Sequence, residues 1–483
     1  MKNFLDCRDP YHARWLGAGG LALLVAYIVI SNLAGIHVRH FFYADDWAWL
    51  YYSEFRTYRQ LFSIVPCQIY NDRPMGAVAI KALYGLLGLN SKCFLYFQLF
   101  LHVANCVLLY FISRRYIGKL PALVAGALAG SWISANNAVF WTAAIFDLLG
   151  ATLCLLSLLL WQIAQVKKPA VIFSIAGAAI YFLAIRTKEY SIGLPALLFI
   201  MGIALENRRT SQAIRLLLPY LSVMLLCGSR YLYLLFSGPS LLGATDNPYG
   251  LHLSGMFANL LFYLSNAFYF ELFGDVAFVL AFLAFALAGV RSGWFGRIFL
   301  VSFSWFALML GPTLLLVLHR DPLYLYTPHF FLALAVAALL NLGRYWRIFA
   351  AMFSLLLVGI PPSSRWCRNI NMFYEVKSSM SRDQFSSFLK VTGEIARGST
   401  IFVAGVEPYF NPFSYGPGYS VMIEKKDSSL KFVVEKPPDE LKKEFCESKF
   451  PKRFVTFYGR EARDETQLVS DSCGRRIPRP AKE

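Results

Sequence analysis

Two adjacent aspartates are the residues of this chain best suited to acid–base chemistry. Asp45 and Asp46 stand in the stretch Phe41 to Trp47, where aromatic side chains surround them. Neighbouring carboxylates in a partly apolar setting repel one another, which raises the pKa of one and suits it to general-base work. The pair also offers hard oxygen ligands for a divalent cation, and two solvated loop acids are the plain structural alternative.

Charged residues recur at four later points, each beside a long apolar segment. They are found in Asn71 to Pro74, at Asp147, in Arg186 to Tyr190 and in His319 to Pro328. Each group alone is typical of a structural ion pair at a helix end. Because they recur on the same predicted membrane face and carry both signs of charge, a shared polar cavity is the better interpretation.

The elements that must position these residues are apolar helices. Of 483 residues, 57% are hydrophobic and 16% charged, which excludes an ordinary soluble domain. No basic run interleaved with aromatics accompanies the net charge of +17, so no nucleic-acid partner is expected. Eleven stretches are long enough to cross about 30 Å of hydrocarbon: residues 16–33, 94–113, 120–137, 146–165, 169–186, 190–206, 213–236, 274–290, 297–318, 324–343 and 345–361.

Basic residues occupy alternate connections between these stretches, as the positive-inside rule requires of cytoplasmic segments. With a cytoplasmic N-terminus, the inner connections contain Lys2, Arg8, Arg14, Arg114, Arg115, Lys119, Lys167, Lys168, Arg208, Arg209, Arg215, Arg291, Arg297, Arg344 and Arg347. The acids concentrate on the other connections. This pattern predicts an outer location for the acidic pair and for the tail.

The predicted organisation is a transmembrane domain over residues 1–361 and an external C-terminal domain over residues 362–483. The first outer loop, residues 37–92, carries the acidic pair and an amphipathic stretch from Met75 to Leu89 that is typical of an interfacial helix. In the tail, alternating runs at 400–403, 431–434 and 454–457 predict a small α/β or β-rich domain.

Cysteines give a further expectation for the outer segments. Cys446 and Cys473 are predicted to pair in an oxidising compartment, with Cys367 as an alternative partner, and Cys67 and Cys93 form a second candidate pair.

The order of these motifs resembles the GT-C superfamily, integral-membrane glycosyltransferases that use lipid-linked sugar donors. The resemblance covers residues 1–345 and rests on Tyr-Ala-Asp-Asp-Trp at 43–47, Arg-Pro at 73–74, Trp-x5-Asp-Leu-Leu at 141–149, Lys-Glu at 188–189 before Pro195, and Arg-x3-Tyr-Leu-Tyr-x-Pro at 320–328. Protein O-mannosyltransferases, lipid A aminoarabinose transferases and oligosaccharyltransferases belong to this superfamily. The fold it implies is a polytopic α-helical membrane protein of about 11 helices.

The resemblance also implies roles for individual residues. Asp45 or Asp46 would be the catalytic carboxylate, and Arg73, Lys188 and Arg320 would bind the donor phosphate. Guanidinium forks match phosphate oxygens in a bidentate way, which ranks the two arginines above the lysine. Supporting roles would go to Asp147, Glu189, Asp72 and Tyr324. A divalent Mg or Mn ion held by Asp45, Asp46 and Asp147 is left open, since only some members of the superfamily need a metal.

The predicted function is transfer of a sugar from a polyprenyl-phosphate donor to a hydroxyl of a glycan, lipid or protein acceptor. A lipid or glycan flippase, or a non-catalytic assembly protein on the same scaffold, is the alternative. Transporters tend to show internal repeats and charges near the bilayer midplane, and neither is evident here. The absence of an Asn-x-Ser/Thr sequon favours a bacterial inner membrane with a periplasmic active site.

Overall fold

The computed structural model separates into two compact units. The helical unit contains Met1–Gly35, Ser63–Gly76 and Leu95–Arg368, and the α/β unit contains Ile36–Phe62, Ala77–Phe94 and Asn369–Glu483. The residues that the structure describes are 10–36, 40–62, 73–132, 138–237, 250–268, 287, 289, 292–316, 318–359, 365–407, 411–414, 416 and 418–473.

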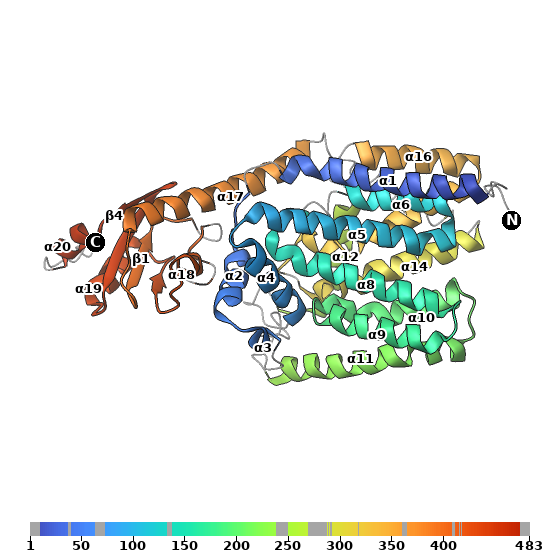
Figure 1. Ribbon diagram of the computed structural model, residues 1–483, viewed down its shortest axis with the longest axis horizontal. Helices are drawn as coiled ribbons and strands as arrows, with labels where there is room; N and C mark the ends of the chain where they lie inside the picture. Colours follow the sequence, from blue (N-terminus) through green and yellow to red (C-terminus); the bar gives the residue numbers. More distant parts are fainter. Residues whose placement is uncertain are drawn as a thin grey trace. The chain divides into compact units, whose positions relative to one another are not determined.

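Long helices lie side by side in the helical unit (Figure 1). They are α1 (Pro10–Ile36), α5 (Ser91–Ile117), α6 (Lys119–Ser131), α8 (Ile145–Ala164), α9 (Ala170–Ile185), α10 (Leu194–Ala204), α11 (Thr210–Ser237), α12 (Met256–Phe268), α14 (Gly293–Leu310), α15 (His329–Ala338) and α16 (Arg344–Gly359). Among the described residues, the helices over Ser91–Ile117, Thr142–Ala164, Thr210–Tyr233 and Gly293–Leu315 are long and apolar enough to cross a membrane. The chain is therefore a helical membrane protein.

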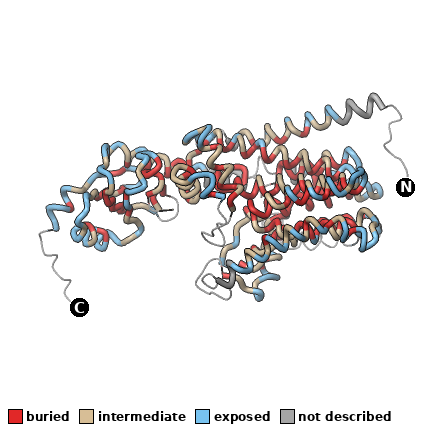
Figure 2. Tube along the Cα trace, turned by 60° about the horizontal axis from the view of Figure 1, so that its bottom comes forward, coloured by how far each residue is buried: buried red, intermediate tan, exposed pale blue. Residues whose placement is uncertain are grey.

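Helices or shorter helical turns occupy all the predicted spans that fall within the described residues. The stretch at 274–290 lies almost wholly outside those residues, so the count of about eleven stays a prediction. Buried residues line the facing sides of the helices (Figure 2). Outward-facing α11 exposes large apolar side chains, among them Leu218, Leu225 and Leu226, as a lipid-facing helix does.

A glycine lets two of these helices approach α9 closely. A Cβ on Gly177 would lie 1.9 Å from the Tyr220 hydroxyl, so any other residue there would have to displace that side chain. Tyr220 of α11 donates to the Ser157 carbonyl, and the Ser157 hydroxyl of α8 donates to the Gly177 carbonyl at 2.8 Å. Small residues and interhelical hydrogen bonds of this kind hold helices together where hydrophobic burial against lipid supplies little driving force.

Polar contacts mark both ends of α8. Asp147 lies in its first turn and Gln165 follows its last residue. At 1.5 Å per residue these positions are about 27 Å apart, close to the thickness of a bilayer core. At the Gln165 end, Arg208 donates to the Gln165 carbonyl, Arg115 pairs with Glu206, and Arg297 donates to Asn207. The helical unit thus has one polar end at each side of its apolar helices.

The C-terminal part of the α/β unit is built on a four-stranded sheet in the order β2-β1-β3-β4. Its strands are β1 (Thr400–Ala404), β2 (Lys431–Val433), β3 (Lys452–Tyr458) and β4 (Glu461–Asp464). β1 pairs in parallel with β2 and β3, and β4 runs antiparallel to β3. The three predicted strands are confirmed, and the short β4 is an addition to them.

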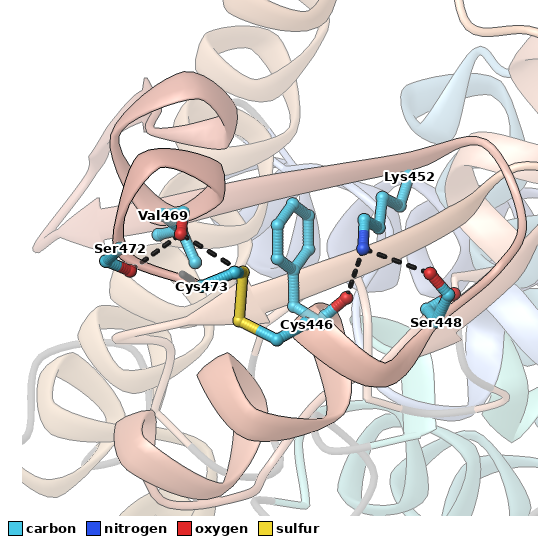
Figure 3. The surroundings of a disulfide bond; sticks show 7 residues. Cys446, Ser448, Lys452, Val469, Ser472 and Cys473 are labelled. Carbon is cyan, nitrogen blue, oxygen red and sulfur yellow. Dashed lines mark hydrogen bonds between the residues drawn. A yellow bond between two sulfur atoms is a disulfide. The ribbon is translucent and has the colours of Figure 1, made fainter. Parts of the chain in front are cut away.

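Four helices accompany this sheet: α17 (Arg365–Thr392), α18 (Tyr419–Lys425), α19 (Pro438–Glu447) and α20 (Thr466–Ser472). The predicted Cys446–Cys473 disulfide is confirmed, and it joins the end of α19 to the residue after α20 (Figure 3). Beside it, Lys452 donates to the carbonyls of Phe445 and Ser448. Cys93 is a free cysteine, while Cys67 lies outside the described residues.

The α/β unit also includes α2 (Asp45–Phe55), α3 (Tyr58–Leu61) and most of α4 (Pro74–Leu87). The predicted amphipathic stretch is thus a helix. The sequence prediction divided the chain at residue 361, whereas the compact units divide the first outer loop between them. The physical reason is the aromatic packing of residues 41–55 on the core of the C-terminal part.

Candidate functional site

A buried ion pair lies at one end of the helical unit. Lys188 Nζ donates to Asp147 Oδ2 at 2.9 Å, and the two side chains are only 4% and 3% exposed. Asp147 belongs to the first turn of α8, and Lys188 precedes the 3-10 turn η3 (Glu189–Gly193). Gly150 permits this approach, since a Cβ there would lie 2.8 Å from the Tyr190 hydroxyl.

A second ion pair adjoins the first. Arg73 donates to Glu189 through Nε at 3.0 Å and through Nη2 at 2.7 Å, the bidentate geometry of a guanidinium and a carboxylate. The amide of Met75 donates to the Arg186 carbonyl, which fixes the same two segments together. These side chains are 19% and 29% exposed, so water reaches this pair more than the first.

The structure therefore brings together four of the predicted site residues as two acids and two bases. Arg73 and Lys188, predicted as phosphate ligands, each have a carboxylate partner. The Lys188 ammonium also lies 5.5 Å from the centre of the Tyr324 ring, so the predicted supporting residue Tyr324 is a neighbour of this cluster. Asp72 lies outside the described residues.

Arg320 differs from the other two predicted phosphate ligands. Its Nε donates to Asn259 Oδ1 at 2.7 Å, and its guanidinium lies 5.7 Å from the Phe262 ring centre. The Asn259 amide is itself held by the carbonyls of Leu314 and Leu316. Arg320 is exposed, and no carboxylate among the described residues forms an ion pair with it. Its guanidinium is oriented by Asn259.

The acidic pair belongs to the α/β unit, at the start of α2. Asp46 is 1% exposed, and its Oδ2 accepts a hydrogen bond from the Tyr43 amide at 3.2 Å. Asp45 is half-buried. Ala44, directly before the pair, has φ 50° and ψ −129°, a conformation that favours glycine. The two carboxylates thus differ in their surroundings. Asp46 is buried and accepts a hydrogen bond from the backbone just before α2, whereas Asp45 is the more accessible of the two.

Asp45 and Asp46 lie in one unit and the charged cluster in the other, so a cavity shared between them stays a prediction. The described residues contain no group of three or more His, Cys, Asp or Glu able to hold a metal. Asp147 is already occupied by Lys188. A metal held by Asp45, Asp46 and Asp147 therefore stays a prediction.

A buried polar network in the helical unit was not predicted from the sequence. His102 contacts the Tyr326 hydroxyl through Nδ1 at 3.0 Å, and the Asn105 amide donates to the same hydroxyl at 3.0 Å. Asn105 also donates to the Leu148 carbonyl, one residue beyond Asp147. The missed signal is the spacing of Gln98, His102 and Asn105, which places three polar side chains on one face of an apolar helix.

A second set of buried hydrogen bonds reaches the backbone of Asp147. The Tyr190 hydroxyl donates to the Asp147 carbonyl at 3.1 Å and accepts from the Thr327 hydroxyl at 2.7 Å. Trp305 donates to the Thr327 carbonyl at 2.9 Å. Tyr190 and Thr327 are both buried. These bonds tie α8, η3 and the segment before α15 into one polar layer beneath the charged cluster.

Comparison with known proteins finds solved structures of similar fold but low sequence identity. No protein-family model matches the chain, and no curated protein matches it. Among solved structures, ArnT from Cupriavidus metallidurans bound to undecaprenyl phosphate is 15% identical with a TM-score of 0.52, covering 91% of this chain and 93% of that one. The same protein in the apo state gives 14% and 0.53.

A second solved structure is similar over the same extent. The archaeal oligosaccharyltransferase AglB from Archaeoglobus fulgidus, in complex with an inhibitory peptide and a dolichol-phosphate, is 10% identical with a TM-score of 0.51. The match covers 92% of this chain and 69% of AglB. The chain thus has a GT-C-like fold, as its motifs predicted.

Proposed function

We propose that this chain is a membrane glycosyltransferase that moves a sugar from a polyprenyl-phosphate donor to an acceptor hydroxyl. The observation that carries the proposal is the likeness over nine tenths of the chain to two proteins that were each solved with a polyprenyl phosphate. The acidic start of α2 and the cationic residues of the helical unit supply the side chains that such a transfer requires.

Asp45 is the general base of the proposed reaction. The acceptor oxygen attacks the anomeric carbon while its proton passes to the Asp45 carboxylate, and the bond from the anomeric carbon to the phosphate oxygen breaks. Asp45 is preferred over Asp46 because it is the more accessible of the two. Asp46 accepts from the Tyr43 amide and thereby holds the turn that presents Asp45.

Arg320 is the main ligand of the leaving phosphate. A polyprenyl phosphate gains negative charge as the glycosidic bond breaks, and a prepositioned cation stabilises that charge. Arg320 is held by Asn259 through Nε, and its two terminal nitrogens are the atoms that would bind phosphate oxygens. Arg73 and Lys188 contribute positive electrostatic potential near the phosphate instead of direct bonds to it, because each is already paired with a carboxylate.

The proposed setting is a bacterial inner membrane with the acidic pair and C-terminal part on the periplasmic side. The distribution of basic connections supports this orientation. A disulfide in the C-terminal part supports it as well, because such bonds persist in oxidising compartments. The acceptor is a hydroxyl of a glycan, lipid or protein.

The test compares Asp45→Asn with Asp46→Asn in membranes supplied with a radiolabelled polyprenyl-phosphate sugar. Asp45→Asn should slow transfer by about 10²- to 10⁴-fold while donor binding is retained, because only proton abstraction is lost. Asp46→Asn should slow transfer less, since an asparagine oxygen still accepts the Tyr43 amide. Asp439→Asn, in the exposed first turn of α19, is the matched control. Wild-type rates in both test variants would overturn the assignment.

A further inference from the structure

The acid-bearing helix α2 packs against the C-terminal part of its own unit. The Tyr51 and Tyr419 rings stack with centres 3.9 Å apart and planes 9° apart. The Trp47 ring lies 5.4 Å from the ring of Phe385 on α17. The first helix of the outer loop therefore rests on side chains that come more than 300 residues later in the chain.

A hydrogen bond fixes the chain just ahead of the acidic pair. The Ser381 hydroxyl of α17 donates to the Phe42 carbonyl at 2.8 Å, and Ser381 is fully buried. Phe41 adds a ring contact to Phe385 at 5.9 Å. Contacts to α17 and α18 thus lie on both sides of Asp45 in the sequence. Phe42, three residues before Asp45, contacts α17, and the contacts after Asp45 begin at Trp47.

The backbone between these contacts is strained. Ala44 has a positive φ, which an alanine adopts only when the surrounding structure imposes it. A strained residue directly before Asp45 means that the direction of this carboxylate depends on the contacts that hold the turn. Lys81 of α4 donates to the Ser53 carbonyl near the other end of α2, so that end has a separate attachment.

We propose that the C-terminal domain, residues 369–473, is the positioning element for the catalytic carboxylate, with Ser381, Phe385 and Tyr419 as positioning residues. The inference rests on the proposed function, in which Asp45 is the base. Loss of these contacts lets the start of α2 shift. A displacement of about 1 Å at a reacting group can lower a rate by about 10²-fold. The donor phosphate ligands belong to the other unit, so donor affinity should be unaffected.

The experiment is a double-mutant cycle on the stacked tyrosines in the full-length protein. Tyr419→Ala and Tyr51→Ala should each lower kcat by about 10- to 100-fold with an unchanged KM for the polyprenyl-phosphate sugar. The double variant should be no slower than the slower single variant, because both remove the same contact. Tyr419→Phe keeps the ring and should stay within about fivefold of wild type.

Tyr458→Ala is the matched control, because Tyr458 is an exposed tyrosine of the same domain on β3. The Cys446–Cys473 disulfide, assayed by maleimide labelling with and without reductant, reports whether the domain has folded. If Tyr419→Ala fails this check, Tyr51→Ala tests the same contact from the α2 side.

Three results would overturn the inference: wild-type kcat in Tyr51→Ala, strictly additive losses in the cycle, or a change in KM with kcat unchanged. Failure of the proposed function gives a different result. In that case the wild-type protein transfers no sugar, or Asp45→Asn transfers it at the wild-type rate, whatever the tyrosine variants do.

Discussion

The two acidic regions of this molecule differ in how their charge is balanced. In the helical unit, Asp147 and Glu189 each pair with a base, and Asp147 is buried with its lysine. At the start of α2, two carboxylates adjoin in sequence, and one of them accepts a backbone hydrogen bond from Tyr43. In the first region the carboxylates bind cationic side chains, whereas in the second the Asp46 carboxylate accepts from a backbone amide.

This difference indicates what each region can contribute to a reaction. Carboxylates that form ion pairs with neighbouring cations are held in place, which suits them to orienting neighbours. The half-buried Asp45 carboxylate fits the proposed role of general base. Removing a residue should therefore affect mainly stability in the first region and mainly rate in the second.

Lys188→Met should give the largest loss of stability. The substitution leaves Asp147 buried without its partner, which destabilises a protein by about 3 to 5 kcal/mol. The loss of stability is measured by heating the detergent-solubilised protein and monitoring its unfolding by size-exclusion chromatography. The double variant Lys188→Met/Asp147→Leu should recover most of the loss, because an apolar pair of similar volume is often as stable as a buried ion pair. A double variant as unstable as the single one would show that the pair does not act as a unit.

Arg320→Ala should affect donor use more than stability. Arg320 is exposed and forms no ion pair with a described carboxylate, so its removal leaves no buried charge behind. Loss of charge-assisted hydrogen bonds to phosphate, about 1.5 to 3 kcal/mol, should lower kcat/KM by about 10- to 150-fold.

Arg320→Lys sharpens this measurement. Lysine keeps the charge but loses the planar fork, so its kcat/KM should fall between those of Arg320→Ala and wild type. An unfolding midpoint lowered as far as that of Lys188→Met would place Arg320 among the structural charges instead.

Arg73→Lys should have a smaller effect on stability. A lysine cannot reproduce the two parallel bonds to Glu189, but this pair is partly exposed, so the loss should be about 1 kcal/mol. The unfolding midpoint should fall less than in Lys188→Met. An equal fall would mean that water screens the Arg73–Glu189 pair no better than the buried Lys188–Asp147 pair.

Ala44→Gly should have the smallest effect, and in the opposite direction. Glycine relieves the positive φ but adds freedom to the unfolded chain, so the net stabilisation should be at most about 1 kcal/mol. Trypsin cleavage at Arg56 and Arg59, just after and within the helices of this loop, measures how firmly the segment is held. Faster cleavage in Ala44→Gly than in wild type would show that Ala44 is not strained.

Much of the fold could be predicted from local patterns. Alternation predicted β1, β2 and β3, and apolar runs of about 18 residues predicted α1, α5, α6, α8, α9, α10, α11, α14, α15 and α16. No span was predicted where α12 lies. β4 escaped prediction because Glu461 to Asp464 is short and mostly exposed, so it has no apolar alternation to detect. Hydrophobic periodicity indicates which residues face a core, so it cannot predict a strand whose side chains are mostly exposed.

The partners of the charged residues could not be predicted in the same way. Arg73 and Glu189 are 116 residues apart, and Lys188 and Asp147 are 41 apart. Nothing in the local sequence distinguishes a cation that binds phosphate from one that binds a carboxylate. The packing of helices decides it, and that packing depends on contacts such as Phe146 against Gly76, where a Cβ would lie 2.0 Å from the ring.

The stacking of Tyr51 on Tyr419 has a consequence in time. Ribosomes add about 5 to 20 residues per second, so Tyr419 is made about 20 to 75 s after Asp45. During this interval the nascent helix already carries both aspartates but lacks the rings on which it comes to rest. A chain released early by a stop codon before residue 381 would contain α2 but lack Phe385 and Tyr419, whose rings contact it. Synthesis of the last quarter of the protein is therefore the step that completes the packing of α2.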